Sequence, residues 1–256
     1  MEKNRQYHTS LSRGDIGRYV LLPGDPGRTP LIAKHFDSAK EIVFNREYRT
    51  FTGHITGHDG KRIKISTTST GIGCPSAAIA VEELIKIGAD TLIRIGTAGS
   101  IQKKIALGDI VISTASVREE GTTRQYVPLS YPAVASLEIT SALIEAARRL
   151  NIKAHSGISQ CKDAFYSEIP KDVPLSEYNE QMWNVWRRSN VLASAMESSA
   201  LFVISSIRNV RAGEILTVVG KLDAGKLKLS KISSEDAIRI AVEAVRILEE
   251  KRNKRK

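Results

Sequence analysis

Short apolar runs alternate along this chain with segments whose apolar residues recur every three or four positions. The short runs are rich in β-branched residues, which favours strands over 18–22, 91–93, 109–117, 153–161, 191–196 and 215–219. The helical spacing predicts helices over 28–36, 76–87, 136–150, 198–207 and from Ser233 onward. Two further apolar arms, over 48–56 and 62–69, predict a hairpin around His58-Asp59-Gly60.

This order of elements indicates the fold class. Strands and helices alternate without an internal repeat and without a linker rich in Pro, Gly or Ser, which predicts an α/β fold. We expect one domain over 1–250 with a central β-sheet flanked by helices, mixed because of the hairpin. The polar stretch 167–190 is typical of a lid, and a loop as long as 118–135 is usually functional or interfacial.

The most informative stretch is Arg94-Ile-Gly-Thr-Ala-Gly99, directly after the apolar segment 91–93. We interpret it as a buried strand followed by a sharp turn, which is where open α/β sheets bind ligands. An arginine is costly to bury there without an anion, because it stays charged. Two interpretations remain open: an oxyanion site with phosphate as its guest, or a structural arginine paired with an internal carboxylate.

A second candidate anion site follows the first strand. Pro23-Gly-Asp-Pro-Gly27 is a turn-rich loop, and Arg28 opens the helix after it. Strand, glycine loop and helix start together can cradle an anion on free N–H groups. The loop has neither Walker spacing nor the dinucleotide fingerprint. A plain turn is the alternative.

Composition narrows the class of partner. The formal net charge is +10, but five of the basic residues lie in the tail 251–256, which we expect to be solvated and disordered. No basic patch is interleaved with aromatics, and no apolar run is long enough to span a bilayer, so neither nucleic acid nor a membrane is expected. Two cysteines and a polar start without an apolar signal core suggest a cytoplasmic protein that binds small anions.

Four motifs, in order along nearly the whole chain, resemble the hexameric purine/uridine nucleoside phosphorylase family. They are Pro23–Arg28, Ser69–Ser76, Arg94–Gly99 and Met196-Glu197-Ser198. The resemblance implies phosphorolysis of a nucleoside to free base and ribose 1-phosphate, in a homohexamer whose subunits share sites. The stretch 114–135 is similar to the uridine-specific branch, so uridine is the expected substrate. Purine nucleoside or methylthioadenosine phosphorolysis, hydrolysis on the same fold, and nucleoside binding without turnover are the alternatives.

The resemblance also implies roles for residues. Arg94 and Glu197 would be catalytic, and phosphate would be bound by Gly24, Arg28, Arg94 and Thr97, with Arg46 from a neighbouring subunit. The ribose would contact Met196, Glu197 and, across a subunit boundary, His8. The base would contact Phe165, Gly99 and Lys171. No cofactor is implied, although Glu47, Ile72 and Ser76 match positions that hold a monovalent cation in some bacterial members.

The base-recognition set departs from the family pattern. Uridine members read uracil with a glutamine and an arginine after the Phe-Tyr pair, where this chain has Ile169 and Lys171, and a further arginine corresponds to Leu222. The acid that protonates purines in purine members would fall near Gly220-Lys221 and is missing, and Ala195 replaces a glutamate. Residues that could substitute are Lys171, Lys221, Gln181 and Arg188, or Asp223 in a shifted register.

Overall fold

The computed structural model describes residues 5–223 and 226–253, with the backbone alone at 222, 223 and 226. Eleven strands of these residues form one mixed sheet: β1 (Tyr19–Leu22), β2 (Asp37–Asn45), β3 (Tyr48–Thr56), β4 (Arg62–Thr68), β5 (Thr91–Ser100), β6 (Ile110–Glu119), β7 (Ala133–Val134), β8 (Ala154–Lys162), β9 (Ala193–Ala195), β10 (Arg211–Asp223) and β11 (Lys226–Leu229). The α-helices are α1 (Thr29–Ala33), α2 (Cys74–Lys86), α3 (Leu137–Arg149), α4 (Ser176–Arg188), α5 (Ser198–Ile207) and α6 (Glu235–Asn253). Four short 3₁₀ helices are η1 (Pro26–Arg28), η2 (Thr123–Gln125), η3 (Phe165–Glu168) and η4 (Pro170–Asp172).

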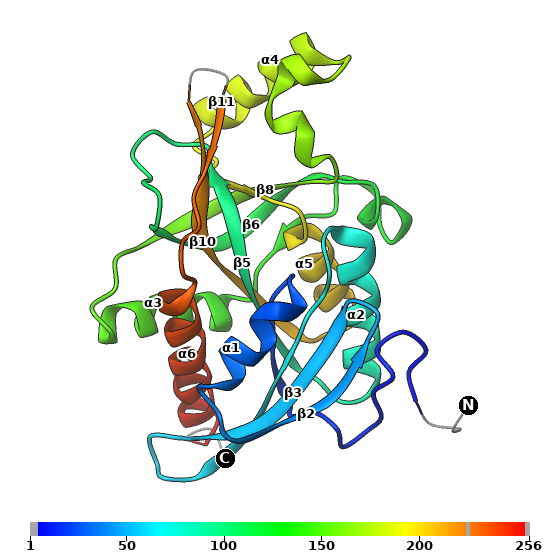
Figure 1. The fold of residues 1–256 in the computed structure, drawn as a ribbon, viewed down its shortest axis with the longest axis vertical. Helices are drawn as coiled ribbons and strands as arrows, with labels where there is room; N and C mark the ends of the chain where they lie inside the picture. The colour runs from blue at the N-terminus through cyan, green and yellow to red at the C-terminus, as the bar shows by residue number, and fades with distance from the viewer. Residues whose placement is uncertain (1–4, 224–225, 254–256) are drawn as a thin grey trace.

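Part of the sheet closes on itself. Strand β5 pairs with β10, which pairs with β6; β6 continues through β8 and β9 back to β5. The sheet extends from β5 outward through β1, β4, β3 and β2 (Figure 1). The expected mixed sheet is confirmed. The closure of five strands was not predicted, because the hydrophobic pattern shows which segments form strands but not which strands pair with one another.

Both faces of the sheet are covered by helices. Along β1 the side chains alternate: Tyr19 and Leu21 pack with α3 and α6 in one core, and Val20 and Leu22 pack with α2 and α5 in another. Figure 1 shows α3 and α6 on one side of the sheet and α2 and α5 on the other. Burial on both faces explains why β1 is apolar throughout. No helix of the described residues is both long and apolar enough to cross a membrane.

The structure corrects several expectations. Strand β5 runs through the whole Arg94–Gly99 motif, so the sharp turn expected after 91–93 is wrong. The segment expected as one helix over 28–36 is η1 followed by the short α1. Strands β2 and β11 were missed, and so was α4 within the expected lid. Strand β2 is mostly polar and exposed, so it carries little hydrophobic period. Helix α4 does have apolar residues at helical spacing, but its polar composition favoured the interpretation as a lid.

The chain end also differs from its prediction. Helix α6 begins near Ser233, whose hydroxyl accepts from the Glu235 N–H at 3.1 Å, and it continues to Asn253. Within the expected tail, Lys251 donates to Glu145 at 2.7 Å. A disordered tail from 251 is therefore wrong for 251–253, and 254–256 lie outside the described residues.

The long loop between β6 and α3 is organised by one buried arginine. Arg118 is only 8% exposed and donates through Nε to Thr123 Oγ1 at 3.1 Å. Its other nitrogens donate to backbone carbonyls farther along the loop, those of Val127, Pro128, Leu129 and Tyr131. One guanidinium thus satisfies carbonyls that a long loop leaves without strand or helix partners.

We expect Arg118→Met to lower the free energy of unfolding by about 3 kcal/mol, because several buried carbonyls lose a charged donor at once. Chemical denaturation measures this loss. Arg124→Met, at an exposed position of the same loop, is the matched control and should change stability little. Equal denaturation midpoints for the two variants would show that the Arg118 contacts do not stabilise the loop.

Candidate active site

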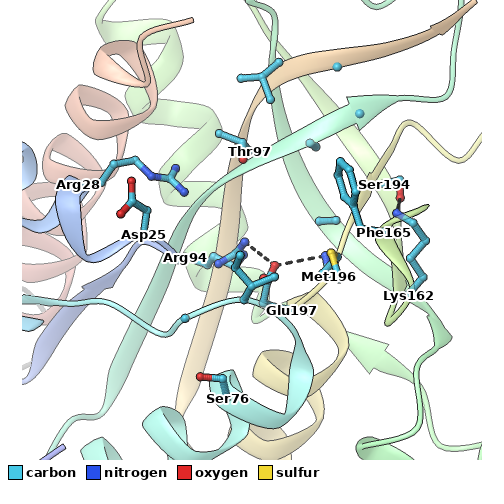
Figure 2. Close-up of a pocket in the computed structure, with 18 of the residues that line it drawn as sticks. Asp25, Arg28, Ser76, Arg94, Thr97, Lys162, Phe165, Ser194, Met196 and Glu197 are labelled. Carbon is cyan, nitrogen blue, oxygen red and sulfur yellow. Dashed lines mark hydrogen bonds and ion pairs between the residues drawn. The ribbon is translucent and has the colours of Figure 1, made fainter. Parts of the chain in front are cut away.

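The motifs meet at one cavity of about 600 Å³. Its wall is built by the loop after β1, by β5, by the end of β8, by η3, by the β9–α5 junction and by β10. The residues that line the cavity include Gly24, Arg28, Arg94, Thr97, Gly99, Lys162, Phe165, Glu168, Met196 and Glu197. Figure 2 shows Arg28 and Arg94 on one side and Lys162 with Phe165 on the other.

Arg94 lies in the middle of β5 between two carboxylates. The register of β5 and β10 sets Glu214 opposite Arg94, with the Arg94 Nε atom 3.2 Å from Glu214 Oε1. On the other side Arg94 Nη2 donates to Glu197 Oε2 at 2.5 Å. Glu214 is fully buried, and this burial raises the pKa of its carboxyl group, while the Arg94 charge opposes the rise. Arg94 is therefore paired with internal carboxylates, as one of the two interpretations expected. These pairs leave the Nη1 atom of its guanidinium without a partner among the described residues.

Glu197 is held rigidly at the start of α5. Its Oε1 accepts from the Gly73 N–H at 2.8 Å, and its Oε2 accepts from Arg94 and from the Met196 N–H at 3.2 Å. The Gly73 backbone has φ +88°, a conformation that favours glycine. A glycine at position 73 is therefore needed to direct its N–H at Glu197 without strain. A carboxylate has about four lone-pair directions, so these three donors leave room for a ligand hydroxyl.

The loop after β1 forms a turn and brings the Arg28 side chain to the cavity. Asp25 Oδ1 accepts from the Gly27 N–H at 2.7 Å, so an internal carboxylate occupies this donor at the start of η1. Thr70 and Gly71 N–H groups pair with the carbonyls of Pro23 and Gly24. The Arg28 N–H also donates to the Asp25 carbonyl, at 3.0 Å, so the turn itself uses two of the N–H groups expected for an anion, and the Arg28 side chain extends toward the cavity (Figure 2).

Three buried arginine nitrogens lack a hydrogen-bond partner among the described residues, and one of them, Arg94 Nε, still lies 3.2 Å from Glu214 Oε1. The other two, Nη1 of Arg28 and Nη1 of Arg94, have no such contact among these residues. A side chain at Gly24 would come within 3.8 Å of Arg28 Nη2 and 3.9 Å of Arg94 Nη1, so glycine leaves this space open. Burial and the nearby Arg94 charge lower the pKa of Arg28. Two like charges with unpaired buried donors around one space form a site for an oxyanion.

The opposite end of the cavity holds a buried ion pair that was missed. Lys162 at the end of β8 donates to Glu168 of η3 at 2.7 Å, and each side chain is less than a tenth exposed. In the sequence, the one feature that pointed to this pair was the position of Lys162 at the end of a predicted strand, next to Asp163-Ala164-Phe165. Phe165 also borders the cavity, and a Cβ at Gly99 would lie 3.6 Å from Glu168 Oε1.

Three expected site residues do not line this cavity. His8 lies at another hollow, where its backbone N–H and its Nδ1 atom contact Glu83 at 3.0 and 2.8 Å. Arg46 is exposed in the turn between β2 and β3, with φ 55° and its guanidinium 5.7 Å from the Tyr7 ring. Lys171 is exposed on η4. The side chains of Leu222 and Asp223 lie outside the described residues.

The residues expected to hold a monovalent cation lie close together. Ser76 Oγ donates to Glu47 Oε1 at 2.8 Å, and Ile72 borders the same cavity. One carboxylate and one hydroxyl are a sparse set of hard oxygen ligands, so the cation stays a prediction.

Comparison with known proteins agrees with this site. Residues 18–250 match the model of the phosphorylase superfamily, so the chain belongs to that family. It is 45% identical to a uridine phosphorylase of Treponema pallidum over 95% of this chain and 94% of that protein. It is 44% identical to a uridine phosphorylase of Thermococcus kodakarensis, over 97% and 88% of the two chains. A guanosine phosphorylase of Halorubrum lacusprofundi is 37% identical over 95% of this chain and 99% of that protein.

Proposed function

We propose that this protein cleaves uridine with inorganic phosphate, giving uracil and ribose 1-phosphate. The observation that carries the proposal is the pair of unpartnered buried nitrogens, Arg28 Nη1 and Arg94 Nη1, beside a cavity that also presents Glu197. The two uridine phosphorylases at 44% and 45% identity support the substrate.

The phosphate would lie between the two arginines, against Gly24 and Thr97. Guanidinium groups suit a phosphate dianion, because each offers several donors in a planar fork. In this position a phosphate oxygen attacks C1′ of the ribose as the C1′–N bond breaks, and the base leaves with the bonding electron pair. The sugar becomes cation-like on the way, so a fixed anion below C1′ stabilises the transition state.

Glu197 would orient the ribose. Its carboxylate accepts from a sugar hydroxyl, and its contacts to Gly73 and Arg94 fix it in place. Because Glu197 also contacts Arg94, the ribose and phosphate sites share one rigid unit. This coupling positions C1′ over the nucleophile, which is the largest contribution expected in a reaction of two bound substrates.

We propose further that His8 and Arg46 complete the site of a neighbouring subunit. Both lie outside this chain's own cavity, on elements tied together by the Asn45 Nδ2 donation to the His8 carbonyl at 2.7 Å. Tyr7 contacts both side chains, packing edge-on to the His8 ring and against Arg46. Arg46 also has a left-handed backbone that is uncommon outside glycine, and such conformations cluster at functional sites.

Guanosine phosphorolysis is the second candidate, supported by the guanosine phosphorylase relative. A purine leaving group is normally protonated at N7 by a carboxylic acid. Among the residues of β10 whose side chains the structure describes, those that border the cavity are Val219 and Gly220, which have no acidic group. This difference favours uridine.

The test is phosphate-dependent release of free base from uridine, guanosine, inosine and methylthioadenosine, compared as kcat/KM. We expect uridine to be preferred, with no release when phosphate is omitted. A preference for guanosine would show that the proposed substrate is wrong and the proposed reaction is right. Release without phosphate would identify a hydrolase, and binding without release would identify a protein that lacks turnover.

A further inference from the structure

We infer that Lys162 and Glu168 read the base, and that they select bases carrying an N–H beside a carbonyl, as in uracil, hypoxanthine and guanine. This inference rests on the proposed function, because it takes the ligand to be a nucleoside. It assigns base recognition to two residues outside the expected set, in place of the exposed Lys171.

The donors around Lys162 are fixed by a chain of buried polar groups. The Glu119 carboxylate can only accept, and it receives the Gln160 Nε2 donation. The Gln160 Oε1 atom therefore faces Ser194, whose hydroxyl donates to it at 2.6 Å. Ser194 has then used its proton, so it accepts from Lys162 Nζ at 2.7 Å. A closed network of this kind holds its members in one arrangement.

This network leaves one donor and one acceptor side by side. Lys162 Nζ has three N–H bonds, and two of them go to Ser194 and Glu168. Glu168 accepts from Lys162 through Oε1, and among the described residues Oε2 has no hydrogen-bond partner. Lys162 Nζ also lies 5.8 Å from the centre of the Trp183 ring. Both residues border the cavity, and we assign the third N–H of Lys162 and Oε2 of Glu168 to a ligand there. Buried polar groups are usually hydrogen-bonded, so a donor and an acceptor without a hydrogen-bond partner at a cavity are candidates for ligand contacts.

The position of the pair suits a flat ring. Phe165 borders the same end of the cavity and offers an aromatic face (Figure 2). Gly99 of β5, which also borders the cavity, has no side chain to fill the space next to Glu168, since a Cβ there would lie 3.6 Å from Oε1. Arg94, which belongs to the phosphate end, lies on the same strand, so β5 connects the two ends of the site.

The chemistry of this pair defines the base. The Glu168 carboxylate accepts from a ring N–H, and the Lys162 ammonium donates to the adjacent carbonyl oxygen. Uracil and hypoxanthine both present this edge. In their nucleosides, cytosine and adenine present a bare ring nitrogen and an amino group instead. The ring nitrogen would then face the Glu168 carboxylate with two lone pairs opposed, and the amino group would face the Lys162 ammonium with two donors opposed. Lys162 also faces the carbonyl oxygen on which negative charge grows as the base leaves.

The test compares methylated bases that differ only at this edge. Dissociation constants of 1-methyluracil against 1-methylcytosine, and of 9-methylhypoxanthine against 9-methyladenine, are measured by calorimetry in the presence of inorganic phosphate, because the methyl group blocks the ring N–H that the sugar replaces in the nucleoside. We expect the wild-type protein to prefer at least one base with the N–H and carbonyl edge over its amino counterpart by about 100-fold. Glu168→Gln should reduce that ratio at least about tenfold, because an amide can offer either a donor or an acceptor.

Further variants control for folding. Lys162→Met combined with Glu168→Gln removes both charges together, so neither is left buried alone, and it should also lose the preference. Glu180→Gln, at an exposed position of α4, is the matched control and should keep the wild-type ratio. Circular dichroism and thermal melting establish that each variant is folded.

The outcomes separate this inference from the proposed function. Loss of the ratio in the variants supports base reading even if no nucleoside is cleaved. Phosphorolysis with an unchanged ratio in folded variants would overturn base reading and leave the function standing. A wild-type protein that binds methylated uracil and hypoxanthine no better than methylated cytosine and adenine would also overturn it.

Discussion

Replacing Arg94 with alanine is expected to reduce phosphorolysis more than a hundredfold at saturating nucleoside. Arg94 is the residue through which the anion site, the ribose site and the sheet are connected. Its Nη1 faces the open space beside Gly24, its Nη2 contacts Glu197, and its Nε lies next to Glu214. Loss of a charged hydrogen-bond partner in a buried site costs on the order of 3 kcal/mol or more, which corresponds to this rate.

The alanine variant also leaves Glu214 buried without its cation, so folding must be tested separately. Arg94→Lys keeps a positive charge between the two glutamates but loses the planar fork, and we expect it to fold and to raise the KM for phosphate. Arg208→Ala is the control, because Arg208 forms an exposed ion pair with Glu82 away from the cavity. Near-normal turnover by a folded Arg94→Lys protein and a folded Arg94→Ala protein would refute the anion site.

Mixing two inactive variants is expected to restore activity. If Arg46 serves a neighbouring subunit, an Arg46→Ala chain keeps an intact cavity, and an Arg94→Ala chain keeps an intact Arg46. After random reassembly at equal amounts, about one site in four combines both intact parts, when each site takes Arg46 from one neighbour of a symmetric oligomer. Activity should therefore rise from near background to about a quarter of the wild-type value per site.

The mixing experiment has its own control. The two variants are separately denatured, combined, refolded and passed over a sizing column, and each variant alone is treated in the same way. Mixed oligomers that form and stay inactive would show that Arg46 acts within its own chain or not at all. A wild-type protein that is fully active as a monomer would exclude shared sites.

The sequence determined the type and order of most elements, because their hydrophobic period is a local property. The helices over 76–87, 136–150 and 198–207 and the strands over 18–22 and 109–117 have counterparts close to the predicted bounds. Helix α6, predicted from Ser233 onward, buries residues that recur every three or four positions, among them Ala241, Val245 and Leu248. The motifs around Gly24, Arg94 and Glu197 converge on one cavity, as the resemblance implied.

Only the tertiary structure decided which groups share charge and hydrogen bonds. Arg94 meets Glu197 across 103 residues of sequence and meets Glu214 through the register of β5 and β10. The unused donor of Lys162 and acceptor of Glu168 became visible only with the network through Ser194. Likewise, only the structure separates exposed Lys171 from the cavity. The physical reason is that periodicity records which face of an element is buried, whereas partners across a sheet are chosen by strand order and register.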